Sequence, residues 1–103
     1  MEYRHISQAE AARIMAADPS CLILDVRRPD EFAGGHIPGA VCVPNETIGA
    51  AEIPALPDKG RRILVYCRTG RRSRQAAAKL AAKGYADILD FGGIITWRGP
   101  IER

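Results

Sequence analysis

The chain has 103 residues, of which 47% are hydrophobic and 26% are charged, and its formal net charge is +3. These values fit one ordinary folded domain spanning 1–103, and they exclude a disordered or low-complexity chain. The longest apolar run, residues 63–67, is far shorter than the roughly 18 residues of a membrane span, and the first twenty residues do not read as a signal peptide. We therefore expect a cytoplasmic protein that does not interact with membranes.

The first half of the chain predicts helices alternating with short strands. Residues 3–5 predict a short edge strand, and Ser7 with Glu10 forms a capping box that opens an amphipathic helix ending at Asp18. The continuous apolar run 21–26 predicts a strand buried on both faces. A short helix over 29–33, with proline in its first turn, and a short strand over 40–43 follow.

The second half predicts a surface excursion of helix turns and loop over 45–60, followed by the strongest strand of the chain over 62–66. An alanine-rich helix over 71–83, a strand over 87–91 and a short helical segment carrying Trp97 complete the pattern. This alternation predicts an α/β fold, an open sheet of about five mostly parallel strands with helices on both faces.

Positive charge is concentrated around the strongest predicted strand. Six arginines and no acidic residue occur between positions 61 and 74, so the remainder of the chain is net acidic. They are Arg61, Arg62, Arg68, Arg71, Arg72 and Arg74. A local field of this kind favours a small anion or an acidic partner surface over nucleic acid.

The three cysteines differ in their surroundings. Cys21, Cys42 and Cys67 are widely spaced, without a redox pair or a zinc-ligand pattern, so we expect no disulfide scaffold, metal or other cofactor. Cys21 and Cys42 fall within apolar runs and are predicted to be inert core thiols.

Cys67 ends the strongest predicted strand, where ligands bind in open α/β sheets. The amides of the short loop that follows can point toward the sulfur, and the next helix presents its positive end. Such surroundings favour the thiolate and would also stabilise a persulfide anion, so no separate general base is needed. Cys67 is therefore the predicted nucleophile.

Four segments, in order along nearly the whole chain, resemble single-domain rhodaneses. They are Asp25-Val26-Arg27 with Glu31-Phe32, then Gly35-His36-Ile37-Pro38-Gly39-Ala40, then Val65-Tyr66-Cys67-Arg68-Thr69-Gly70-Arg71-Arg72-Ser73, and finally Gly92-Gly93 with Trp97. The resemblance implies the rhodanese-like fold and a thiosulfate sulfurtransferase. Cys67 would accept the outer sulfur of thiosulfate or a related donor, and then pass it by ping-pong kinetics to cyanide or a thiol. A thioredoxin-like or other sulfur-trafficking protein is an expected acceptor.

The loop after Cys67 supplies the predicted substrate-binding residues. They are Arg68, Thr69, Gly70, Arg71, Arg72 and Ser73. The arginines are expected to attract an anionic donor, and plain solvated surface is their alternative role. The hydroxyls of Thr69 and Ser73 are expected to donate to the sulfur, and the alternative is that they serve only as a loop residue and a helix-start residue.

Residues outside the loop have mainly structural predicted roles. By the resemblance, Asp25 and Arg27 help to hold the active loop, and a conventional ion pair is an equal alternative. His36 is expected to make a structural hydrogen bond, Gly92-Gly93 to allow a tight turn and Trp97 to pack.

Two other functions stay open. A class of dual-specificity phosphatases and some arsenate reductases share the rhodanese-like fold, and a phosphatase cradle is typically His-Cys-x5-Arg. Here Tyr66 precedes the cysteine and Ser73 holds the arginine position, so the six-residue loop from Cys67 to Arg72 favours sulfur over phosphate. A sulfur carrier or interaction module without turnover of its own is the other alternative.

Overall fold

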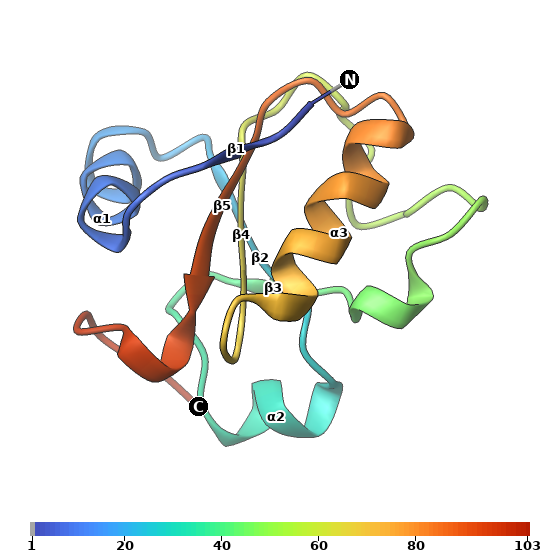
Figure 1. Cartoon of the computed structure of the whole chain (residues 1–103). Coiled ribbons are helices and arrows are strands. Elements are labelled where there is room, and N and C mark those ends of the chain that lie inside the picture. Colours follow the sequence, from blue (N-terminus) through green and yellow to red (C-terminus); the bar gives the residue numbers. More distant parts are fainter. Residues whose placement is uncertain (1) are drawn as a thin grey trace.

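The computed structural model describes residues 2–103 and contains a five-stranded sheet in the order β1-β5-β4-β2-β3 (Figure 1). The strands are β1 (Arg4–His5), β2 (Leu22–Asp25), β3 (Val41–Cys42), β4 (Ile63–Cys67) and β5 (Ile88–Gly93). Every neighbouring pair is parallel. The predicted open sheet is confirmed, and β4 is its central strand.

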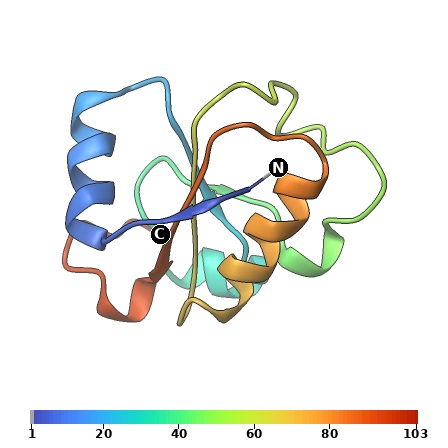
Figure 2. The same ribbon diagram turned by 45° about the horizontal axis from the view of Figure 1, so that its top comes forward.

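Helices cover both faces of this sheet. Figures 1 and 2 show α1 on one side and α3 on the other, with α2 near the carboxyl ends of the strands. The helices are α1 (Gln8–Ala17), α2 (Pro29–Gly34) and α3 (Arg71–Ala82), and two short 3-10 turns are η1 (Asn45–Thr47) and η2 (Ile94–Thr96). Among residues 2–103, no helix has the length and apolarity needed to cross a membrane.

The central strand β4 divides the interior into two apolar layers. Its residues Ile63 and Val65 pack with α3, and Cys67 shares that face. Leu64 and Tyr66 instead pack in the layer that contains α1. Because successive strand residues point to opposite faces, this alternation places Cys67 on the α3 side of the sheet.

The ends of the helices follow from local sequence. The Ser7 hydroxyl accepts the backbone N–H of Glu10 at 3.1 Å, which is one half of the predicted capping box, whereas the Glu10 carboxylate pairs with Arg13. Helix α3 begins after Gly70, whose φ of 106° lies in the left-handed region that favours glycine. The turn at Gly70 fixes the point at which the chain leaves the loop after Cys67.

The predicted burial of two cysteines is wrong. Cys21 and Cys42 are half-buried rather than core thiols, because Cys21 precedes β2 and Cys42 lies on the edge strand β3. Desolvation by partial burial is the main reason that the pKa of each thiol is raised. The segment 45–60, predicted as a surface excursion, places Ile48, Ile53 and Leu56 in the α3-side core.

Candidate active site

Cys67 is fully buried at the carboxyl end of β4. Its Sγ accepts a hydrogen bond from the backbone N–H of Gly70 at 2.9 Å. The chain thus turns sharply between β4 and α3 and directs an amide at the sulfur. An N–H donor beside the start of a helix stabilises negative charge on that atom.

The end of β5 supports this loop from the side. The Ile95 N–H donates to the Arg68 carbonyl at 3.1 Å. A Cβ built on Gly93 would lie 2.6 Å from the Thr69 Cα and would also collide with the Arg68 carbonyl oxygen. Glycine is therefore required at position 93 because the loop backbone approaches it closely. The predicted role of Gly92-Gly93 as a tight turn is sharpened to one of close approach.

Arg72 is held by an acidic partner on α2. Its guanidinium donates to both carboxylate oxygens of Glu31, at 2.7 and 3.0 Å. This hydrogen bonding is the main reason that the pKa of Glu31 falls from 4.5 to about 2. Arg72 was predicted to bind the donor, but the structure engages its guanidinium with Glu31. Glu31 belongs to a segment that resembles the rhodaneses, but no spacing signal in the sequence pairs it with Arg72.

The hydroxyl of Ser73 bonds to Asp90 and Gly70 and not to the sulfur, its predicted partner. It lies 2.7 Å from the Asp90 carboxylate and 3.0 Å from the Gly70 carbonyl, and the residue is completely buried. Ser73 therefore contacts the support of the loop rather than the sulfur. Asp90 was missed by the sequence analysis, although an acidic residue inside the apolar run 88–91 was the available signal.

Asp25 and Arg27 form a buried ion pair at the end of β2. The Arg27 Nη2 lies 2.7 Å from Asp25 Oδ2 and also donates to the Gly35 carbonyl at 2.7 Å. These bonds join the end of β2 to the end of α2. The contacts are those of a conventional ion pair, the alternative role predicted for these two residues. Among residues 2–103, no side-chain hydrogen bond of Asp25 or Arg27 reaches the loop 67–72.

Three of the predicted substrate-binding residues are exposed around the buried cysteine. Arg68 and Thr69 occupy the loop, and Arg71 opens α3. The predicted loop residue Gly70 is buried beneath them and supplies the N–H to the sulfur. We call the exposed Arg68, Thr69 and Arg71 the rim of the loop, and its positive charge close in the chain to an amide-bonded thiol suits an anionic ligand.

His36 and Tyr66 hold the turn that follows α2. The His36 ring stacks on Phe32 with centroids 3.8 Å apart, and its Nδ1 is 2.9 Å from the Phe32 carbonyl oxygen. The Tyr66 hydroxyl accepts the Ile37 N–H at 3.1 Å. His36 thus makes the structural hydrogen bond expected of it. Trp97 packs against Phe91 with ring centroids 5.7 Å apart.

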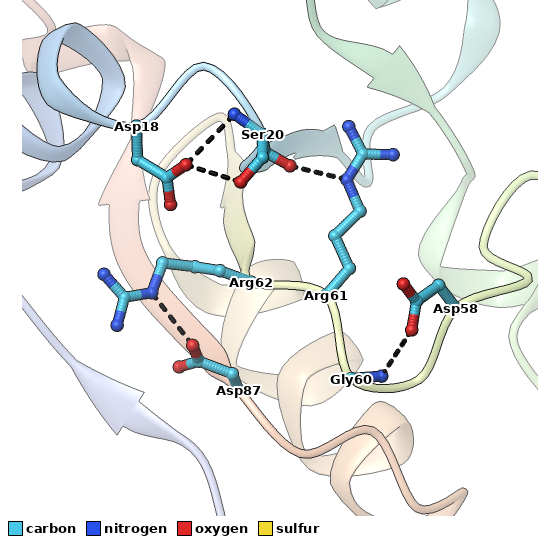
Figure 3. A pocket seen from close by; sticks show the side chains of 7 residues that line it. All are labelled: Asp18, Ser20, Asp58, Gly60, Arg61, Arg62 and Asp87. Atoms are coloured by element: carbon cyan, nitrogen blue, oxygen red, sulfur yellow. Dashed lines mark hydrogen bonds and ion pairs between the residues drawn. The ribbon is translucent and has the colours of Figure 1, made fainter.

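An open depression of about 710 Å³ lies at the opposite end of the strands from Cys67, by the amino ends of β2 and β4 (Figure 3). Its polar side chains bond to one another or to nearby backbone. Arg62 donates to Asp87, Arg61 donates to the Ser20 carbonyl and Asp58 accepts the Gly60 N–H. Cys67 lies at the other ends of the strands, so this depression is separate from the loop that follows Cys67.

The chain is similar to known proteins over most of its length. The family model described as "Rhodanese-like domain" matches residues 7–99. A protein named sulfurtransferase from Allochromatium vinosum is 39% identical over 95 residues, covering 89% of this chain and 85% of the relative. The thiosulfate sulfurtransferase GlpE of Pseudomonas entomophila is 32% identical over 98 residues, covering 94% and 86%.

Solved structures agree with the sequence relatives. A rhodanese with anions from E. coli superposes with a TM-score of 0.72 at 32% identity, covering 80% of this chain and 96% of that one. A rhodanese-related protein from Thermoplasma volcanium gives 0.81 at 26% identity, covering 97% and 98%. With the parallel sheet and the strand-end cysteine loop, these matches show that the chain belongs to the rhodanese-like domain family and is a rhodanese-type sulfurtransferase.

Proposed function

We propose that this chain is a thiosulfate sulfurtransferase that works through a persulfide on Cys67. The observation that carries the proposal is the 2.9 Å hydrogen bond from the Gly70 N–H to the Cys67 Sγ at the carboxyl end of the central strand. The same amide would stabilise a persulfide anion formed there. The GlpE relative named thiosulfate sulfurtransferase, and the anions in the E. coli rhodanese structure, support the choice of donor.

In the first half-reaction the Cys67 thiolate attacks the outer sulfur of thiosulfate. A new S–S bond forms to Sγ, the S–S bond of thiosulfate breaks, and sulfite leaves with the bonding electron pair. Arg68 and Arg71, exposed at the rim, would attract the donor dianion. The product is the Cys67 persulfide.

In the second half-reaction an acceptor attacks the outer sulfur of that persulfide. Cyanide would leave as thiocyanate, and a thiol acceptor would itself become a persulfide. In both cases the S–S bond to Cys67 breaks and its electron pair returns to Sγ, which regenerates the thiolate. A thioredoxin-like or other sulfur-trafficking protein is the thiol acceptor we propose. We place this exchange in the cytoplasm, since all three cysteines are free thiols, as a reducing compartment favours.

Phosphate chemistry is a weaker candidate at this site. The loop from Cys67 is one residue shorter than a phosphatase cradle. Arg72 lies one position early for the phosphate clamp, and both of its terminal nitrogens are bonded to Glu31. A sulfur carrier without turnover of its own remains the second candidate, because the same thiol would serve it.

Steady-state kinetics separate these functions. We expect thiosulfate and cyanide to give parallel double-reciprocal lines, as a ping-pong mechanism requires, and Cys67→Ser to abolish turnover. Cys42→Ser is the matched control and should retain activity. Full activity in Cys67→Ser, or turnover of an aryl phosphate or arsenate that depends on Cys67, would refute the proposal. Slow thiosulfate turnover together with fast exchange from a protein persulfide would favour the carrier.

A further inference from the structure

Asp90 is a buried carboxylate in the apolar strand β5, with no exposed surface. Among residues 2–103, its carboxylate makes three polar contacts, with the Ser73 Oγ at 2.7 Å, the Gly92 N–H at 3.1 Å and the His5 Nδ1 at 3.2 Å. Because successive strand residues point to opposite faces, Asp90 lies on the α3 side of β5 together with the buried apolar side chain of Ile88. A carboxylate buried among such residues is costly unless it is fully bonded.

Two of these contacts reach the elements that hold the Cys67 loop. Ser73 belongs to the first turn of α3, and Gly92 immediately precedes Gly93, whose backbone the loop approaches closely. Asp90 therefore joins the two supports on either side of the loop. A shift of either support would move the loop backbone with it.

A short chain of contacts leads from Asp90 to the sulfur. The Ser73 hydroxyl has one proton, and the nearer, charged acceptor is Asp90. The same proton is shared with the Gly70 carbonyl oxygen, 3.0 Å from the Oγ, and Gly70 is the residue whose N–H donates to the Cys67 Sγ. The position of that N–H thus depends on where Asp90 holds Ser73.

We infer that Asp90, acting through Ser73 and Gly92, is a positioning residue that sets the geometry of the Gly70 N–H around Cys67. This inference rests on the proposed sulfurtransferase reaction. None of the hydrogen bonds of Asp90 is made with Cys67, so it acts on the reacting sulfur only through Ser73 and the loop backbone. Its loss should slow the chemical step without weakening donor binding.

The test compares Asp90→Ala, Ser73→Ala and the double variant in thiosulfate:cyanide turnover. We expect each single variant to lower kcat by about 10- to 100-fold, the range that small misplacements of reacting groups cost. The KM for thiosulfate should stay within about twofold of the wild-type value, and the double variant should be no slower than the worse single one. Asp90→Asn keeps the shape of the side chain and one acceptor oxygen, so this variant should retain most of the activity.

A second readout does not depend on sulfur chemistry. Hydrogen exchange of the amides over 68–73 should quicken in Asp90→Ala and Ser73→Ala and stay slow in Asp90→Asn. If wild-type protein fails to form a persulfide, the proposed function is wrong, and the exchange measurement still decides whether Asp90 orders the loop.

Asp87→Asn is the matched control, since Asp87 immediately precedes β5 and pairs with Arg62 at the amino ends of the strands, away from Cys67 (Figure 3). It should change neither kcat nor loop exchange. The inference is wrong if folded Asp90→Ala or Ser73→Ala keeps kcat within about twofold of wild type or raises only KM, or if the two losses are additive. If Asp90→Ala does not fold, Ser73→Ala carries the decision.

Discussion

Glu31 and Arg72 lie 41 positions apart in the chain and meet in a two-bond ion pair beside the Cys67 loop. The pair joins α2, near the carboxyl end of β2, to the first turn of α3. Arg72 therefore holds the loop from one side while Gly93 meets it from the other.

Removing the Glu31 charge should destabilise the protein in a pH-dependent way. The pKa of Glu31 falls from 4.5 to about 2 on folding, because the carboxylate accepts hydrogen bonds from Arg72. A depressed pKa stabilises the folded state above pH 4.5, and that contribution is lost as the pH falls toward 2. We expect Glu31→Gln to lower the free energy of unfolding by about 2 kcal/mol at pH 7, allowing for the partial exposure of the pair.

Urea denaturation at pH 7, 5, 4 and 3 checks this prediction. The gap between wild type and Glu31→Gln should narrow as the pH falls below 4.5. A gap that stays constant over this range would show that the ion pair is not its source.

A side chain at position 93 should displace the active loop. The Cβ of Gly93→Ala would lie 2.6 Å from the Thr69 Cα, and loop and strand backbone would have to separate. We expect a loss of about 1–3 kcal/mol of stability, as for other overpacked sites, and a more than tenfold drop in kcat. Gly49→Ala is the control, because nothing lies within 4 Å of the added Cβ there. Equal activity in the two variants would contradict the role assigned to Gly93.

The buried Asp25–Arg27 pair should be important for stability. The Asp25 side chain is fully buried, and Arg27→Met would leave its charge without the guanidinium partner. We expect about 3 kcal/mol of destabilisation, typical of breaking a buried pair from one side. Arg28→Met, which removes an exposed pair with Asp30, should change the unfolding midpoint little. Similar midpoints for the two variants would argue against this account.

Prediction from the sequence succeeded where the signal was local. The strand predicted over 62–66 and the helix predicted over 71–83 were marked by an apolar run and by Gly84 after the helix, and they correspond to β4 and α3, with Cys67 as the last residue of β4. The same local signals produced the prediction of an open parallel sheet, which is confirmed.

Prediction from the sequence failed where a side chain's partner is distant in the chain. Spacing placed Arg72 and Ser73 next to the site, but their contacts depend on Glu31 and Asp90, which only the tertiary fold brings near. The predicted burial of Cys42 failed for a related reason, since composition alone does not show which strand lies at the edge of a sheet.

The exposed arginines of the rim should govern donor binding. We expect Arg68→Ala with Arg71→Ala to raise the KM for thiosulfate by about fivefold to tenfold and to change kcat less, because the loss is mainly one of attraction. Added salt should weaken donor binding in wild type more than in the double variant. Arg13→Ala, on α1 and paired with Glu10, is the control. An unchanged KM in the double variant would assign these arginines to solvated surface.

The central claim is that sulfur is carried on Cys67, and peptide mass mapping after thiosulfate treatment tests it most directly. The account predicts the mass of one added sulfur atom on the peptide containing Cys67, its removal by cyanide, and no such addition on the half-buried Cys21 and Cys42. Unmodified Cys67 in folded protein that nevertheless turns over thiosulfate, or added sulfur confined to Cys21 or Cys42, would contradict it.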